Sequence, residues 1–189
     1  MRRAVAFWFV WPALALAQST LPNLQPAAGP PVPAHIVQHI ADARLSGEGK
    51  LTWFGLRVYD ARLYVPAPGL NLAELDTQSF ALHLTYARKL AGQAIAERSR
   101  DEMEKLGAGS EEQRAAWLRE MIRIFPDVAA GQTLTGVHLA NGVTRFFHDG
   151  RLAGEIGDPA FGRAFFAIWL DPRTSAPRLR TELLQRAAR

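Results

Sequence analysis

The sequence predicts an α+β domain in which a large antiparallel β-sheet carries helices layered on one face. Strand-like segments come first, helical segments fill the middle, and strands and helices return toward the C-terminus. Two dipeptides typical of tight hairpin turns, Asn141-Gly142 and Asp149-Gly150, indicate antiparallel pairing. Strands and helices that are segregated in this way favour an α+β fold over an alternating α/β fold.

Composition excludes several classes of protein. The 189 residues are 48% hydrophobic and 21% charged, with a formal net charge of +4 and no cysteine. These values are ordinary for a globular chain and argue against a disordered one. A chain without cysteine has no disulfide, no thiolate nucleophile and no cysteine–zinc site. The weak positive charge does not indicate a nucleic-acid partner, and the sequence contains no phosphate loop and no GxGxxG motif for a cofactor.

The first 17 residues predict a signal peptide. Arg2 and Arg3 precede an uncharged stretch from Ala4 to Leu16, which is too short to span a membrane. Ala15-Leu16-Ala17 then offers a small-x-small cleavage site before Gln18. We therefore expect a periplasmic or secreted protein with no transmembrane segment after cleavage.

Residues 18–34 contain five prolines among Gln, Ala, Gly and Asn, which is typical of a linker. The domain is expected over residues 35–189, beginning with a short helix from His35 to Asp42. A strand at residues 44–46 and a turn or bulge at Gly47-Glu48-Gly49 should follow.

Aromatic and aliphatic residues dominate Leu51 to Val65, as in a long strand or a hairpin. Phe80 to Arg88 alternates like a strand, with Phe80, Leu82, Leu84 and Tyr86 on one face. Helices are expected over residues 92–106, which end at Gly107, and after a capping-box pattern at Ser110 as far as Phe125.

The two turn signals near the C-terminus predict a three-stranded meander. Counting from a two-residue turn at each, Val137 should face Phe146 and Phe146 should face Ala153. On the other face, Gly136 should face Phe147 and Phe147 should face Leu152.

Two helices should end the chain. Asp158 and Pro159 are typical of the start of a helix, and the apolar segment Ala160 to Leu170 that follows should be the most buried helix. A last helix is expected from Pro177 to Ala188.

The candidate ligand site lies on the long strand segment. Read as one continuous strand, Trp53, Arg57, Tyr59 and Leu63 share a face, with Asp60 and Arg62 on the opposite one. A guanidinium and a hydroxyl beside apolar surface could fix the carboxylate of an amphipathic anion. The alternative is a strand face that is solvated or paired for structural reasons.

Other polar groups give weaker signals. His35 and His39 have the spacing of two metal ligands on a helix, but no third ligand follows, so a solvated helix face is favoured and no metal is expected. His83 and His138 lie on predicted strands, where polar sheet positions explain them. No Gly-x-Ser-x-Gly nucleophile motif occurs.

The chain resembles the bacterial exported branch of the chalcone isomerase-like family. The similar stretches are Gly47-x-Gly49 with Leu51 to Val65, Gly92 to Met103, Phe125 to Asp127, Phe146 to Gly150 and Asp158 to Pro172. The resemblance implies an open-faced β-sandwich, in which helices cover a large antiparallel sheet and leave a cleft between the two layers.

The catalytic residues of true chalcone isomerases do not carry over. The family's tyrosine position falls on Ile95, its asparagine on Glu102, its late hydroxyl residue near Ile168 and its strand threonine on Tyr59. The arginine position falls on Gly47, or on Lys50 with a gap. No catalytic residue is therefore assigned, and the polar network needed for cyclisation is absent from the sequence. Non-catalytic relatives bind fatty acids through a basic residue and a tyrosine.

Three hypotheses follow. The leading one is an exported, non-catalytic domain that binds a small amphipathic ligand such as a fatty acid, with Arg57, Tyr59, Lys50 and Trp53 as ligand-binding residues. The second is an isomerase or intramolecular lyase with a different residue set drawn from Tyr59, His83 and His138. The third is an envelope component that binds only proteins.

Overall fold

The structure is a computed structural model that describes residues 31–186. Six strands form one antiparallel sheet in sequence order, with no crossover among them. They are β1 (Arg44–Trp53), β2 (Leu56–Val65), β3 (Phe80–Tyr86), β4 (Thr133–His138), β5 (Thr144–His148) and β6 (Arg151–Ile156). The predicted signal peptide and most of the predicted linker lie outside the described residues.

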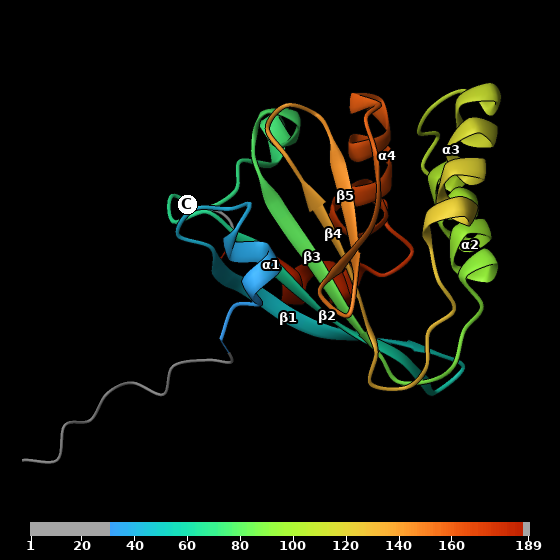
Figure 1. The fold of residues 1–189 in the computed structure, drawn as a ribbon, viewed down its shortest axis with the longest axis horizontal. Coiled ribbons are helices and arrows are strands. Elements are labelled where there is room, and N and C mark those ends of the chain that lie inside the picture. The colour runs from blue at the N-terminus through green and yellow to red at the C-terminus, as the bar shows by residue number, and fades with distance from the viewer. Residues whose placement is uncertain (1–30, 187–189) are drawn as a thin grey trace, which may run out of the picture.

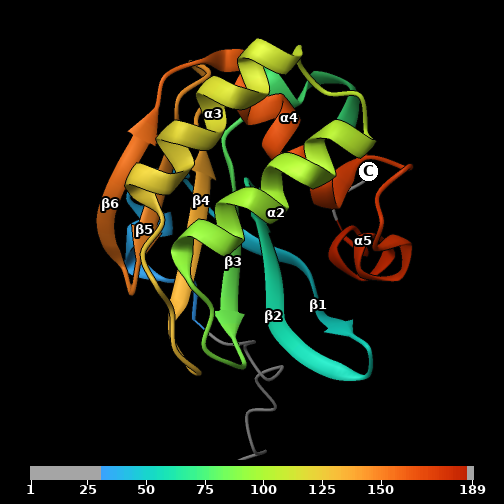
Figure 2. The ribbon, with the colours of Figure 1, turned by 90° about the vertical axis from the view of Figure 1, so that its right-hand side faces the viewer.

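Helices cover the sheet unequally (Figures 1 and 2). One face carries α2 (Gly92–Lys105), α3 (Glu111–Ile124), α4 (Pro159–Leu170) and α5 (Pro177–Leu183). Of the segments within residues 31–186, the other face carries only α1 (Ala34–Val37) and the chain around it. A 3₁₀ segment, η1 (Leu72–Thr77), joins β2 to β3. The predicted α+β class with an open antiparallel sheet is confirmed.

Local sequence signals explain where the long helices begin. The Ser110 hydroxyl accepts a hydrogen bond from the Gln113 backbone N–H, and the Gln113 side-chain oxygen accepts one from the Ser110 backbone N–H, which completes the predicted capping box. The Asp158 carboxylate caps α4, whose first residue is Pro159. The last helix is shorter than expected and ends at Leu183.

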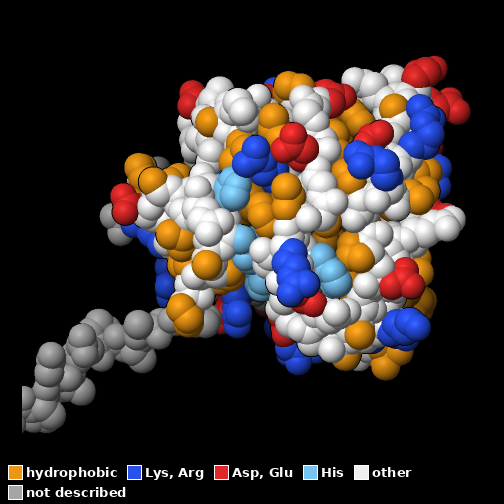
Figure 3. Space-filling view, in the orientation of Figure 1, with side chains coloured by type: hydrophobic (Ala, Val, Ile, Leu, Met, Phe, Trp, Pro, Cys, Tyr) orange, Lys and Arg blue, Asp and Glu red, His pale blue; other side chains and the backbone are white. Residues whose placement is uncertain are grey.

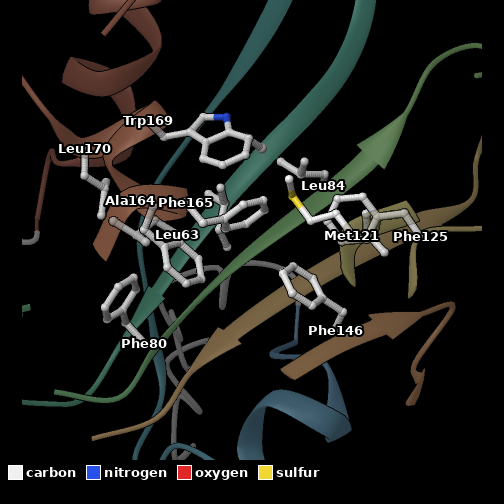
Figure 4. Packing of buried hydrophobic residues seen from close by; sticks show 14 of the residues in the cluster. Leu63, Phe80, Leu84, Met121, Phe125, Phe146, Ala164, Phe165, Trp169 and Leu170 are labelled. Atoms are coloured by element: carbon white, nitrogen blue, oxygen red, sulfur yellow. The ribbon is translucent and has the colours of Figure 1, made fainter. Parts of the chain in front are cut away.

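The main core lies between the sheet and the helices (Figure 4). Phe161, Phe165, Phe166 and Trp169 of α4 are all buried, as predicted for this helix. The Phe166 ring packs edge-on against Phe80 of β3, and Phe165 packs edge-on against Phe146 of β5. Such large rings contribute most of the apolar area that stabilises a domain of this size.

The hairpin register of β4 and β5 differs from the predicted one. Gly136, not Val137, pairs with Phe146, because residues 140–142 form a three-residue loop in which only Gly142 has a positive φ. A Cβ at position 136 would lie 3.2 Å from the Phe166 ring, so glycine leaves room for that ring.

The turn between β5 and β6 has the predicted two residues. Phe147 faces Leu152 as expected. Phe146 faces Gly154 rather than Ala153, since a β-bulge intervenes.

The segment Leu51 to Val65 is a hairpin, not one strand. Phe54 and Gly55 form its turn, with φ values of 46° and 78°. No turn forms at residues 47–49, which pair within β1, and the bulge lies directly before them, between Leu45 and Gly47. Gly47 is required there, since a Cβ would lie 2.1 Å from the Glu182 carbonyl of α5.

Candidate functional site

The four predicted ligand residues lie on two different faces of the sheet. Leu51 pairs with Tyr59, but Thr52 pairs with Arg57, so Val58 is an extra residue on β2. A bulge of this kind shifts the alternation of side chains by one position. The prediction that Arg57 and Tyr59 share a face is therefore wrong.

Arg57 and Lys50 lie with Asp60, on the sheet face that α1 covers farther along. The Arg57 guanidinium is exposed and forms a two-pronged ion pair with the Asp60 carboxylate. Lys50 is exposed and pairs in register with Asp60 across the strands. The bulge thus places Arg57 in a local ion pair with Asp60. The sequence alone had predicted that Arg57 binds the ligand.

Tyr59 lies on the helix-covered face and is buried. Its hydroxyl oxygen accepts a hydrogen bond of 2.9 Å from the Trp169 indole nitrogen, and its ring packs edge-on against Tyr86. Burial raises the pKa of Tyr59 far above its usual range, so the phenol is neutral at physiological pH. The hydroxyl proton has no acceptor among the described residues, which leaves Tyr59 able to donate one hydrogen bond.

A buried carboxylate lies near Tyr59. Glu102 of α2 accepts hydrogen bonds from the Ser175 hydroxyl at 2.5 Å and from Lys105 Nζ at 2.9 Å, and it forms an ion pair with Arg98. Burial alone would raise the pKa of Glu102, but the Ser175 and Lys105 hydrogen bonds and the Arg98 charge outweigh it and lower the pKa. A carboxylate held by three donors is a weak general base.

Arg98 also connects this region to Trp53. Its guanidinium carbon lies 4.9 Å from the centre of the Trp53 ring, a cation–π geometry. Arg98 lies on the same side of the sheet as Tyr59, whereas Arg57 and Lys50 lie on the opposite side. The sequence did not indicate this contact of Arg98, because the charges of α2 are explained equally well by pairing along the helix.

Two histidines share one hydroxyl on the α1-covered face. Thr135 Oγ1 lies 3.0 Å from His35 Nε2 and 2.8 Å from His83 Nδ1, so the hydroxyl forms a hydrogen bond with each imidazole. Burial, then the nearby His35 and Arg62, lower the pKa of His83 to about 4. Figure 3 shows histidine side chains beside Lys and Arg side chains on this side of the molecule.

The residues of the predicted alternative enzyme do not form one site. Tyr59 pairs with Tyr86 at one end of β3, and His138 pairs with Phe80 at the other end. Six residues of strand separate those ends by about 20 Å. His83 contacts Thr135 on the opposite face of the sheet. No two of the three can act on one small substrate.

A pocket of about 540 Å³ lies along α4, on the side away from Trp169. Ala160, Ala164 and Ala167 of α4 line it, and Trp117 of α3 and the segment 106–109 enclose it. The Trp117 indole nitrogen donates a 2.8 Å hydrogen bond to Asp158, which holds the ring in place. A volume of this size lies within the range of about 300–1,000 Å³ typical of small-molecule sites.

Two arginine–aspartate pairs border this pocket. Arg163 binds the Asp76 carboxylate of η1, and Arg173 binds Asp171 at 2.8 Å. The pocket therefore combines an apolar floor with a polar rim. Sequence reasoning missed it because its walls come from positions between 76 and 173 that only the fold brings together.

The decisive comparison is with protein families. The family described as chalcone isomerase-like matches residues 26–185. The chain belongs to this family. No curated protein matches the chain.

The solved structures that match include a fatty-acid binding protein of Arabidopsis thaliana. Its TM-score is 0.63 at 14% sequence identity, over 78% of this chain and 89% of that one. At this identity the likeness shows a shared fold. No helix within residues 31–186 has the length and apolarity needed to cross a bilayer.

Proposed function

We propose that this member of the chalcone isomerase-like family is an exported, non-catalytic protein that binds a small amphipathic molecule such as a fatty acid. The pocket along α4 carries the proposal, because an apolar floor can hold an alkyl chain while a polar rim holds a head group. The fatty-acid binding relative of the same fold supports it. The separation of Tyr59, His83 and His138 argues against the alternative isomerase.

The rim determines the orientation of the ligand. The guanidinium groups of Arg163 and Arg173 are exposed, and each is already paired with one aspartate. Exposed pairs of this kind contribute little stability, so a ligand carboxylate can share the free N–H groups at small cost. The alkyl chain would then lie over Ala164 and Ala167 and gain about 0.8 kcal/mol for each buried CH₂.

The ligand residues predicted from the sequence give a second location for the same function. Tyr59 and Trp53 lie on the helix-covered side with Arg98, whereas Arg57 and Lys50 lie on the other side. A head group bound between β2 and α2 would use the free Tyr59 proton. This location remains a prediction that the same experiment tests.

Calorimetric titration with saturated fatty acids of increasing chain length tests both locations. Ala167 is half-buried in the pocket wall, and Ala167→Phe would fill the pocket. Ala115→Phe is the matched control, because Ala115 is exposed on α3 and does not line the pocket. We expect affinity to rise with chain length and to fall at least about 10-fold in Ala167→Phe only, the loss expected from about two displaced CH₂ groups.

Other results would change or overturn the proposal. A loss in Tyr59→Phe with normal binding by Ala167→Phe would move the ligand to the space between β2 and α2. Affinity that does not depend on chain length would overturn fatty-acid binding. A partner protein that co-purifies with an empty domain would favour the envelope component instead.

Export is a separate part of the proposal. Cleavage after Ala17 gives a mature chain that starts at Gln18. N-terminal sequencing of the protein recovered from the periplasm or medium of a producing bacterium tests it. An intact N-terminus on cytoplasmic protein would contradict export and leave the ligand proposal unaffected.

A further inference from the structure

The turn between β1 and β2 concentrates exposed apolar side chains. Phe54 is 90% exposed, Leu56 is 58% exposed and Trp53 is 53% exposed. Half of the six large hydrophobic residues that are exposed within residues 31–186 therefore fall in four consecutive positions. Figure 2 shows this turn at the lower right of the molecule. Exposed apolar groups gathered at one place usually mark an interaction surface.

The residue at the first turn position is unusual for a hairpin. Phe54 and Gly55 have φ values of 46° and 78°, and the turn between β5 and β6 has nearly the same values, 46° and 79°. That second turn uses Asp149-Gly150, and the loop between β4 and β5 uses Asn141-Gly142, as hairpin geometry favours. A bulky residue at positive φ is strained. Phe54 is thus a less favourable residue for this turn position than Asp149, which the chain has at the equivalent position of the other turn.

Packing within the protein does not explain Phe54. Its ring contacts the Trp53 ring edge-on at 5.1 Å between centroids, and most of its surface faces solvent. Trp53 itself also contacts the Arg98 guanidinium. A strained and exposed aromatic residue in a turn is expected where a binding function outweighs local stability.

The surroundings of the turn are basic. The segments 50–60 and 87–91 carry four cations, Lys50, Arg57, Arg88 and Lys89, against the single carboxylate of Asp60. A hydrogen bond from the Ala87 amide to the Val58 carbonyl holds the second segment beside the hairpin. Arg57 is paired with Asp60, and the other three cations form no ion pair with any residue that the structure describes.

We propose that this turn docks the protein on an anionic bilayer surface, with Trp53, Phe54 and Leu56 entering the interface and Lys50, Arg88 and Lys89 contacting lipid phosphates. A narrow, convex turn with few apolar side chains suits a soft interface better than a protein partner, which needs a broad complementary patch. Tryptophan favours the membrane–water boundary, and cations beside it are attracted to anionic lipids. This inference does not rest on the ligand proposed above.

Vesicle flotation tests the proposal with purified protein that starts at Gln18, so that the apolar segment Ala4 to Leu16 cannot itself bind the vesicles. The probes are vesicles of phosphatidylglycerol and phosphatidylcholine in equal amounts, and vesicles of phosphatidylcholine alone. We expect binding to the anionic vesicles, weakened by salt because charge contributes to it. Of the five tryptophans, Trp117 and Trp169 are buried and Trp8 and Trp11 belong to the predicted signal peptide, so in protein that starts at Gln18 a blue shift of tryptophan emission on binding reports Trp53.

The variant Phe54→Asn removes the ring and creates an Asn-Gly turn, which suits the observed φ values. Its melting temperature should be equal to or higher than that of the original protein, while vesicle affinity falls about 10-fold to 100-fold, as for an exposed phenylalanine ring. Replacing Arg88 and Lys89 together by glutamine should lower affinity for anionic vesicles about 30-fold. Leu152→Asn is the matched control, because Leu152 is as exposed as Leu56 but lies on β6.

Several results would overturn the proposal. Equal vesicle binding by Phe54→Asn and the original protein would exclude the turn as the docking element. A lower melting temperature of Phe54→Asn would exclude it as well, because it would show that the ring packs within the fold. Absence of vesicle binding, together with a dimer that Phe54→Asn converts to a monomer, would mean that the turn joins two copies of the chain. Absence of both would reject membrane docking outright.

Discussion

On one face of the sheet, α4 places four aromatic rings against the strands, whereas on the other face residues 31–43 bring one turn of helix and two histidines. The helix-covered face is closed by apolar contacts among rings from α4, β3 and β5. The α1-covered face depends on Ile36 and Ile40 and on polar bonds to Thr135.

This difference separates two physical roles. Apolar burial contributes in proportion to area and does not depend on pH, so the helix-covered face should determine most of the stability at any pH. Buried imidazoles favour their neutral form, so the α1-covered face should determine how stability changes between neutral and acidic pH. The predictions below test this division.

The largest effect is expected on the helix-covered face. Phe166 is 1% exposed and contacts Phe80, His138 and Phe165. Phe166→Ala should lower the free energy of unfolding by about 3–5 kcal/mol, because the rigid surroundings cannot close the cavity. Urea unfolding at neutral pH measures it.

Phe147→Ala is the matched substitution on the α1-covered face. Phe147 is also buried, but the layer above it is one short segment, which we expect to close part of the cavity. We expect a cost at the lower end of the same range, about 3 kcal/mol. A cost for Phe147→Ala above that of Phe166→Ala would contradict the comparison.

The next effect is pH dependence from the α1-covered face. The pKa of His83 falls from 6.5 to about 4 on folding, through burial and then the nearby His35 and Arg62, and burial and then His39 lower the pKa of His35. The unfolded chain therefore binds protons at a higher pH than the folded chain does. The free energy of unfolding therefore keeps its full value above pH 6.5, where the histidines are neutral in both states. It decreases as the pH falls toward 4, by about 3 kcal/mol for His83.

Urea unfolding of the original protein and of His83→Gln between pH 7 and pH 4 checks this sign and size. The groups that face the pair from neighbouring elements are His39, Tyr64, Arg62 with its partner Glu48, and Arg145 with its partner Glu155. His83→Gln keeps a polar partner for Thr135 and should flatten the curve. Parallel curves for the two proteins would show that His83 does not control the pH response.

A smaller effect is expected at Tyr59. Tyr59→Phe leaves the buried Trp169 N–H without an acceptor, which costs about 1–3 kcal/mol. Thermal unfolding measures it. Asp158→Asn is the control for indole bonding, because it keeps an acceptor for Trp117 and should cost less. A stability unchanged in Tyr59→Phe would mean that the Tyr59–Trp169 hydrogen bond does not form.

The sequence was informative where a local pattern has one structural solution. The capping box at Ser110, the start of α4 at Asp158 and the turn at Asp149-Gly150 were predicted correctly, because each depends only on adjacent residues. The apolar segment of α4 likewise indicated its burial. The α+β class followed from these elements together.

Errors arose where one residue changes a register. The Val58 bulge places Arg57 and Tyr59 on opposite faces, and the three-residue loop at residues 140–142 moves Phe146 opposite Gly136. Neither shift follows from the neighbouring residue types, because one extra residue in a strand or a turn leaves the apolar pattern of the segment unchanged. The pocket could not be predicted for the same reason: Asp76, Trp117 and Arg163 meet only in the folded chain.

The smallest effect is expected at Arg57. Its ion pair with Asp60 is exposed, so Arg57→Ala should change the free energy of unfolding by less than about 0.5 kcal/mol. With the ligand in the pocket along α4, fatty-acid affinity should also stay unchanged, because Arg57 does not line that pocket. Calorimetric titration of Arg57→Ala beside Ala167→Phe measures both effects under one set of conditions. A loss of about 10-fold to 100-fold in Arg57→Ala alone would restore the head-group role that the sequence predicted. It would also place the ligand at the β1–β2 hairpin, where Lys50 lies on the same face as Arg57.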